Sequence, residues 1–293
     1  MARPTFDIYS HVTDTIISEI EAGTPPWRKP WTGGGGSVHF PLRHTGDEYR
    51  GINVLMLWIT AAQRGYVSAR WMTYRQAQEL GGQVRKGEKS ATVVKYGTVE
   101  TEDEDGTERR FGYCRAYRVF NSDQIDGLPE AYYVRPDPPC DLGTEADPAL
   151  DAFFAAAGAE IVTTNEPRAY YDMVADRIHM PPIVTFHDAH SYYSTLAHEL
   201  THHSGHVSRL DRFSRFTDRN ARAFEEVVAE IGACMLAVHL GVTPEFDQSA
   251  AYVEGWIEAM KADNRVIFRA ASEAQKAVDF IRAGVQAAEP AMA

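Results

Sequence analysis

The stretch Thr195-Leu-Ala-His-Glu-Leu-Thr-His-His-Ser-Gly205 decides the fold of the second half of this chain. It contains His198-Glu199-Leu-Thr-His202, an H-E-x-x-H pattern. Residues four apart project from one face of a helix, so His198 and His202 can bind one metal ion while Glu199 holds the proton of a metal-bound water. This arrangement is typical of the active half of a zinc metallopeptidase. The competing interpretation is a chance pattern in a histidine-bearing helix.

The sequence around the motif predicts the helix that the motif needs. Asp188 or Ser191 is expected to cap its start, and Gly205 fits its C-terminal end. Apolar residues recur every three or four positions beside the two histidines: Tyr193, Leu196, Ala197 and Leu200.

A third metal ligand is expected from a second helix that begins near Phe224. Zinc peptidases of the two-His-plus-Glu type take their glutamate from such a helix, and Glu226 lies 24 residues after His202. Glu230 is four residues further, faces the same way, and is predicted to be the acceptor that orients a ligand histidine. Glu225 is the rival for the ligand position, and a solvated acidic helix face is the alternative for the whole segment.

Composition predicts a globular protein with two domains. At 293 residues the chain is long for one core, and its 44% hydrophobic and 24% charged residues are typical values. No run approaches the roughly 20 apolar residues of a membrane span, and the first residues do not predict a signal peptide. The three widely spaced cysteines suggest free thiols in a reducing compartment. We therefore expect a cytoplasmic protein with no membrane partner.

The net charge of −12 conceals a basic region in the first half. Residues 134–293 carry a net charge of −11, whereas residues 25–95 carry +7. Cations interleave with aromatic residues there, which suits single-stranded DNA because stacking and phosphate pairing need no groove. Each part of this region also has an interpretation without DNA. The tryptophans could fill the core beside the first helix, and residues 83–89 could be a solvated hairpin connection. The predicted DNA-binding residues are Trp27, Arg28, Lys29, Trp31, Tyr49, Arg50, Arg70, Trp71, Arg85, Lys86 and Lys89.

Periodicity and turn residues predict an α+β chain. A proline-rich stretch over 134–148 is the expected linker between domains at 1–133 and 149–293. A sheet should precede the metal helix, and its edge strand can pair with an extended substrate. Helices are predicted over 5–22, 54–64 (capped by Asn53), 73–80 (capped by Thr73), 147–157 and 248–283. Strands are predicted over 91–96, 111–120, 159–164 and 169–179, with an acidic hairpin loop at 100–108.

With these features in place, the chain resembles the ArdC-type antirestriction proteins of conjugative plasmids over nearly its full length. The first half is similar to the family's single-stranded-DNA-binding domain and to the N-terminal region of some plasmid-borne primases. The motifs that carry this similarity are Val12-Thr13, Pro26-Trp27, Pro30-Trp31, Tyr49 to Asn53, Trp71, Gly81-Gly82, Val84 to Lys89, Val119 to Asn121 and Gln124 to Leu128. The second half is similar to the family's zincin-like metallopeptidase domain through Met180-Pro181, His198 to His202, Gly205-His206, Arg209-Leu210 and Glu225 to Glu230.

The resemblance implies action during conjugation in bacteria. The protein would help incoming plasmid DNA to escape restriction, entering the recipient with the strand. The resemblance also implies a divalent metal at His198, His202 and Glu226, for which zinc is expected and manganese is the alternative. His203 departs from the family, in which an aromatic residue commonly follows the second metal histidine. His203 and His206 are either competing ligands or, as we expect, surface imidazoles.

Three functions compete at this stage. The main hypothesis joins a non-specific single-stranded-DNA-binding domain to a zinc metallopeptidase in which Glu199 is the general base, acting on a protein substrate such as a restriction component. The second is a DNA-coating protein whose metal site is structural or vestigial, with no proteolysis. The third, a nuclease, is weaker because nucleases favour carboxylate-rich metal pairs.

Overall fold

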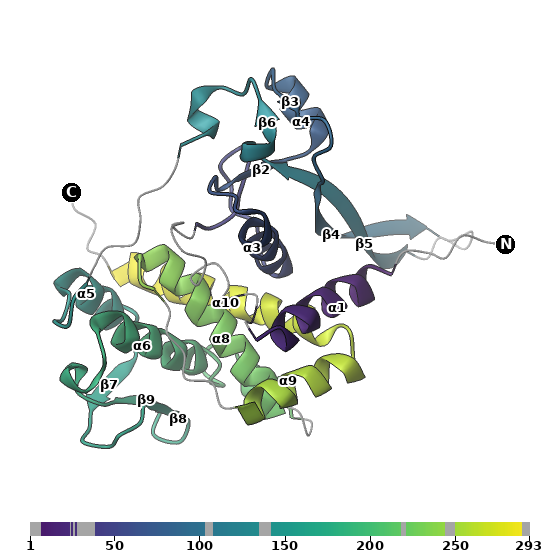
Figure 1. Ribbon diagram of the computed structural model, residues 1–293. Helices are drawn as coiled ribbons and strands as arrows, with labels where there is room; N and C mark the ends of the chain where they lie inside the picture. Colours follow the sequence, from purple (N-terminus) through teal and green to yellow (C-terminus); the bar gives the residue numbers. More distant parts are fainter. Residues whose placement is uncertain are drawn as a thin grey trace.

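The computed structural model describes residues 7–23, 25, 27, 39–102, 108–134, 142–217, 221–243 and 250–288. The described chain is α+β, as predicted. Figure 1 shows the strands of the first half above a group of long helices from the second half. No helix in these residues is both long and apolar enough to cross a bilayer.

The first half is built on a mixed sheet whose order is β1-β2-β5-β4. A small second sheet pairs β3 with β6. The predicted helices over 5–22, 54–64 and 73–80 are all present. The elements are α1 (Ile8–Glu21), β1 (Leu42–Arg43), α3 (Ile52–Arg64), β2 (Arg70–Met72), α4 (Tyr74–Glu79), β3 (Gln83–Val84), β4 (Ala91–Glu102), β5 (Glu108–Asn121) and β6 (Ile125–Asp126).

The predicted caps of α3 and α4 have different outcomes. Thr73 caps α4 as expected, and its side chain accepts from the backbone N–H of Gln76. Asn53 does not cap α3, because the helix already begins at Ile52 after a glycine cap. Its side-chain amide instead pairs with Val94, donating to the carbonyl at 2.9 Å and accepting from the N–H at 2.7 Å. Asn53 thereby satisfies backbone groups of the edge strand β4.

The β4–β5 hairpin is longer than the sequence predicts. Its antiparallel register runs from Ala91 opposite Val119 to Glu102 opposite Glu108. Both ends of the predicted acidic loop at 100–108 therefore belong to strands, and residues 103–107 lie outside the described part of the chain.

The second half places a three-stranded sheet, in the order β7-β9-β8, beside a group of helices. The predicted strand over 169–179 is two strands, because a turn with Asp176 at a φ of +53° separates them. The predicted helix over 248–283 is likewise two helices. The elements are α5 (Pro148–Ala156), β7 (Glu160–Thr163), β8 (Tyr170–Asp172), β9 (Arg177–Met180), α6 (Ala189–Ser204), α7 (Arg212–Arg215), α8 (Ala221–Leu240), α9 (Ala250–Ala262) and α10 (Val266–Ala288).

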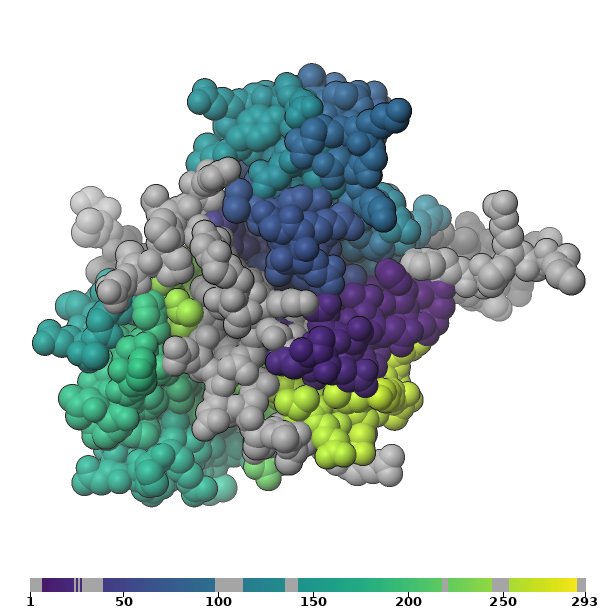
Figure 2. Space-filling model, viewed as in Figure 1, coloured from purple at the N-terminus to yellow at the C-terminus, as the bar shows by residue number. Residues whose placement is uncertain are grey.

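One hydrophobic core runs through both halves. α1 packs against α9 and α3 against α10, and Figure 2 shows the purple α1 directly above the yellow-green helix α9. The Thr13 hydroxyl of α1 donates to the Asn264 carbonyl at 2.7 Å. The domain boundaries at 1–133, 134–148 and 149–293 stay predictions. The buried side chains do not divide at these positions into two separate cores.

Candidate metal centre

Helices α6 and α8 bring the predicted metal ligands together. The side chain of Asp188 caps α6 by accepting from the Ser191 N–H at 2.7 Å, and Gly205 ends the helix. The two helices approach closely where Thr201 meets Gly232. A Cβ atom at residue 232 would lie only 2.6 Å from the Thr201 Cγ2 atom. Glycine at this position therefore allows the contact between α6 and α8.

The side chains of His198, His202 and Glu226 form a compact group of three possible ligands. The two Nε2 atoms of the histidines lie 3.1 Å apart. The Glu226 Oε2 atom lies 3.6 Å from His198 Nε2 and 3.8 Å from His202 Nε2. Tetrahedral coordination with bonds of about 2.0–2.1 Å separates ligand atoms by about 3.4 Å. The three atoms therefore fit a single divalent ion.

These three side chains lie in the wall of a cleft of about 750 Å³. Glu199, which is only 8% exposed, lines the same cleft beside the two histidines. The edge strand β8 forms part of the lining through Tyr170 and Tyr171. A metal position, a neighbouring carboxylate and a strand at the edge of its sheet thus share one cavity.

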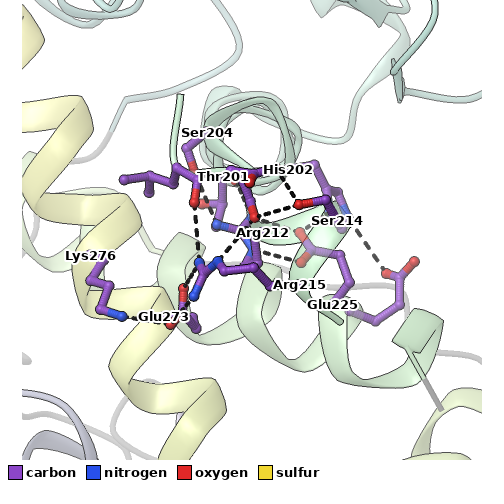
Figure 3. Close-up of polar contacts among 12 residues, drawn as sticks. Thr201, His202, Ser204, Arg212, Ser214, Arg215, Glu225, Glu273 and Lys276 are labelled. Carbon is purple, nitrogen blue, oxygen red and sulfur yellow. Dashed lines mark hydrogen bonds and ion pairs between the residues drawn. The ribbon is translucent and has the colours of Figure 1, made fainter. Parts of the chain in front are cut away.

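A buried ion pair between Glu225 and Arg212 contacts the Nδ1 atom of His202. The sequence did not predict this contact. The His202 Nδ1 atom lies 3.0 Å from Glu225 Oε1. Arg212 donates to both oxygens of Glu225, at 2.6 and 2.7 Å, and is itself fully buried. Figure 3 shows Arg212 at the centre of this network, where it also donates to the Thr201 carbonyl at 2.8 Å. Glu225, considered above as a rival metal ligand, therefore contacts the distal nitrogen of His202 instead.

Glu230 lies next to the other histidine. Its Oε1 atom is 3.9 Å from His198 Nδ1, which is longer than a hydrogen bond. The predicted role of Glu230 as the acceptor for a ligand histidine stays a prediction, and the structure places the carboxylate on the side of His198 where that role requires it.

The carboxylates and imidazoles of this group shift one another's pKa values. Burial lowers the pKa of His202, but hydrogen bonds to Glu225 and Glu226 outweigh it and raise the value to about 10. The pKa of His198 is also raised, because Glu226 outweighs the effect of burial. Burial raises the pKa of Glu226, yet the two imidazoles hold it well below its usual range. Such a site favours a cation, and a bound metal would replace these protons.

His203 differs from the expected surface imidazole. It is only 4% exposed, and burial lowers its pKa to about 4. Its ring meets Tyr171 edge to face at 5.6 Å between centroids. Next to it, Arg209 donates to Asp176 and holds the pKa of that carboxyl well below its usual range. His203 therefore packs from α6 against β8 and the β8–β9 turn, whereas His206 is partly exposed.

Three aromatic residues predicted to bind DNA lie in the core. Trp27, Tyr49 and Trp71 are 0%, 8% and 2% exposed. The Trp27 ring packs on Trp256 of α9, with 5.8 Å between centroids. This corrects the expectation for these rings, since an enclosed ring has no free face for a base. Trp27 instead agrees with the alternative interpretation, in which a tryptophan of this segment fills the core.

The predicted DNA-binding cations fall into three groups. Arg28 and Lys29 lie outside the described residues, as does the remaining tryptophan, Trp31. Arg50 pairs with Asp279, Arg70 donates to backbone carbonyls at 3.3 and 3.4 Å, and Arg85 pairs with Glu88 and Asp126 at 3.0 and 3.2 Å. Lys86 and Lys89 lie on the basic turn, and both are exposed.

Two family models match the chain, one in each half. The model of the N-terminal domain of anti-restriction factor ArdC matches residues 6–120. The model of a zincin-like metallopeptidase matches residues 148–273.

Known proteins match nearly the whole chain. The metal-free crystal structure of the antirestriction ArdC protein from the R388 plasmid is 63% identical, covers 96% of this chain and 99% of its own, and has a TM-score of 0.88. The Mn(II)-bound structure of that protein is 62% identical with a TM-score of 0.84, covering 96% and 98%. Uncharacterised protein y4eC of Sinorhizobium fredii (strain NBRC 101917 / NGR234) is 38% identical over 94% of this chain and 92% of its own. DNA primase TraC of Escherichia coli is 36% identical over 97% of this chain but 28% of its own length.

Proposed function

This chain belongs to the ArdC antirestriction family, and we propose that it protects incoming plasmid DNA from restriction during conjugation. In this proposal the first half binds single-stranded DNA without sequence preference. The second half is a metal-dependent peptidase that acts on a protein substrate such as a restriction component. The observation that carries the second part is the group formed by His198, His202 and Glu226 beside Glu199 in one cleft.

The proposed metal site uses His198, His202 and Glu226 as ligands. The Mn(II)-bound R388 relative and the zincin-like model support a divalent ion, with zinc as the expected metal and manganese as the alternative. When bound, the ion supplies a Lewis acid for water and for a substrate carbonyl. Glu225 fixes the orientation of His202 through its Nδ1 atom.

Glu199 is the proposed general base and then general acid. It accepts a proton from the attacking water and donates that proton to the leaving amine. The edge of β8 pairs with an extended peptide and places the scissile bond over the ligands. The water, the peptide and Glu199 would thus meet within the same cleft.

The test compares the wild-type protein with Glu199→Gln in metal-loaded form. We expect the variant to keep its metal, because Glu199 is not a ligand, and to lose at least about 100-fold in cleavage of an unstructured protein substrate. Unchanged cleavage by the variant would refute the assignment of the base. Metal content measured on the same samples separates loss of chemistry from loss of the ion.

A second function is supported by the relative's structures. The metal-free R388 structure matches this chain at least as well as the Mn(II)-bound one, with TM-scores of 0.88 and 0.84. The fold therefore does not depend on the ion in that protein. If metal-free protein protects DNA fully in a restriction assay, the chain acts as a DNA-coating protein, and the metal site is structural or vestigial.

A further inference from the structure

One face of the β4–β5 hairpin carries tyrosines and cations together. Successive side chains of a strand point to opposite faces, and the register places Lys95 opposite Arg115 and Gly97 opposite Tyr113. Tyr117, two residues beyond Arg115, lies on the same face. We call Lys95, Tyr113, Arg115 and Tyr117 the hairpin face. Both cations are exposed, Tyr117 is 40% exposed and Tyr113 is partly exposed.

The ring of Tyr113 is held in place by the backbone beneath it. A Cβ atom at residue 97 would lie 2.4 Å from the Tyr113 Cζ and Oη atoms, so glycine leaves the space that the ring occupies. The Arg115 guanidinium lies 4.9 Å from the centroid of the same ring, a cation–π distance. Ring and cation are therefore already in contact without a ligand.

The charges of the hairpin face are available to a ligand. Within the described part of the chain, Lys95 and Arg115 form no ion pair with a carboxylate, whereas Arg50 and Arg85 do. The hairpin face itself contains no acidic residue. In Figure 1 the two strands extend away from β3 and β6 to the edge of the molecule.

The spacing along β5 suits an unstacked DNA strand. Side chains two residues apart on a strand are separated by about 6.8 Å, which is about twice the 3.4 Å rise per nucleotide in a duplex strand. Arg115 and Tyr117 are one such step apart, so a phosphate on Arg115 and a base on Tyr117 fit a strand extended to about twice the duplex rise. A duplex cannot use the Tyr117 ring in this way, because its base faces are already stacked.

We propose that the hairpin face is the surface that binds single-stranded DNA. A base stacks on the exposed ring of Tyr117, and Lys95 and Arg115 hold the neighbouring phosphates, with Arg115 positioned by the Tyr113 ring beneath it. This proposal rests on the proposed function, in which the first half binds single strands. It assigns base stacking to the hairpin face and not to the buried rings of Trp27, Tyr49 and Trp71.

The test uses the full chain and a fluorescent oligothymidine in an anisotropy titration across a salt series. We expect Lys95→Ala combined with Arg115→Ala to reduce the slope of log K against log salt by about 1.4, because each phosphate contact on a single strand contributes about 0.7. Tyr117→Ala should weaken binding roughly 10-fold, whereas Tyr117→Phe, which keeps the ring, should bind like the wild type. An oligonucleotide carrying 5-iododeoxyuridine should crosslink to Tyr117 on irradiation.

The matched control removes two exposed cations elsewhere. Lys261→Ala with Arg269→Ala changes the net charge equally, and both side chains are about half exposed, at 59% and 48%. This control should keep the wild-type slope. If Lys95→Ala with Arg115→Ala binds like the wild type, or only Lys86→Ala with Lys89→Ala changes the slope, the hairpin face is not the binding surface. Absence of binding by the wild-type protein at low salt would instead refute the single-strand function itself.

Discussion

At the scale of single residues, Arg212 links the metal site to the body of the molecule. Its guanidinium is fully buried and donates to both oxygens of Glu225, which contacts the distal nitrogen of His202. Such contacts behind a ligand histidine fix the ring and its tautomer. A buried ion pair of this kind is also costly to break, because the remaining partner keeps an uncompensated charge.

We therefore expect Arg212→Lys to lower metal affinity about 10–100-fold, since an ammonium cannot make the two parallel hydrogen bonds to Glu225. A competition assay with a chelator measures this change. Arg215→Lys is the matched control, because Arg215 lies in the same short helix but pairs with Glu273 at 2.8 Å. Wild-type affinity in the Arg212 variant, or an equal loss in the Arg215 variant, would contradict this role.

At the scale of elements, the close contact between α6 and α8 sets the distance between the histidines and Glu226. Gly232 makes that contact possible, because the Thr201 side chain occupies the space that a Cβ atom at residue 232 would need, only 2.6 Å away. Helix α6 carries two of the proposed ligands and α8 carries the third, so any separation of the two helices opens the group.

Gly232→Ala should therefore destabilise the fold by about 1–3 kcal/mol, as overpacking does in a core, and weaken metal binding. Gly284→Ala is the control, because nothing lies within 4 Å of its Cβ position in α10. That change should be neutral or stabilising by up to about 1 kcal/mol. Thermal unfolding of both variants measures the difference. A Gly232→Ala protein as stable as Gly284→Ala would show that the contact is unimportant.

Local sequence patterns predicted those features of the fold that depend on residues a few positions apart. Helix periodicity puts His198 and His202 on one face, and the Thr73 cap depends on residues three apart. The role of Asn53 was missed because its partner, Val94, lies in a strand 41 residues away. Arg212 was missed for the same reason, although its place in the Arg-rich segment before α8 was a usable signal. Composition could not show that Trp27 is buried, because the aromatic residues of a core and of a DNA surface are the same.

At the scale of the whole molecule, the two halves share their core and a polar interface. His239 of α8 stacks on Phe40 at 4.6 Å between centroids, and its Nε2 atom lies 3.2 Å from Arg282 Nη1. Arg282 also donates to Glu48 at 3.4 Å. Burial and the neighbouring Arg282 lower the pKa of His239 to about 4. The imidazole is thus neutral and accepts from Arg282.

This interface predicts a loss of stability in mild acid. The folded pKa of His239 is depressed below that of the unfolded chain, so the unfolded state binds more protons between these values. The contribution of His239 to the free energy of unfolding is therefore fully present above about pH 6.5, and it falls by about 3 kcal/mol as the pH approaches about 4. Denaturant titrations at several pH values measure the slope. His239→Gln should flatten it in this window, and an unchanged slope would contradict the assignment.

The most direct test of the central claim, one divalent ion held by α6 and α8, is anomalous diffraction from crystals of this protein soaked in Mn(II) or Zn(II). We expect one strong anomalous peak about 2 Å from His198 Nε2, His202 Nε2 and a Glu226 oxygen, with Glu225 still bound to Arg212. A peak ligated by Glu225 or His203, or no peak in this cleft, would contradict the proposed metal centre.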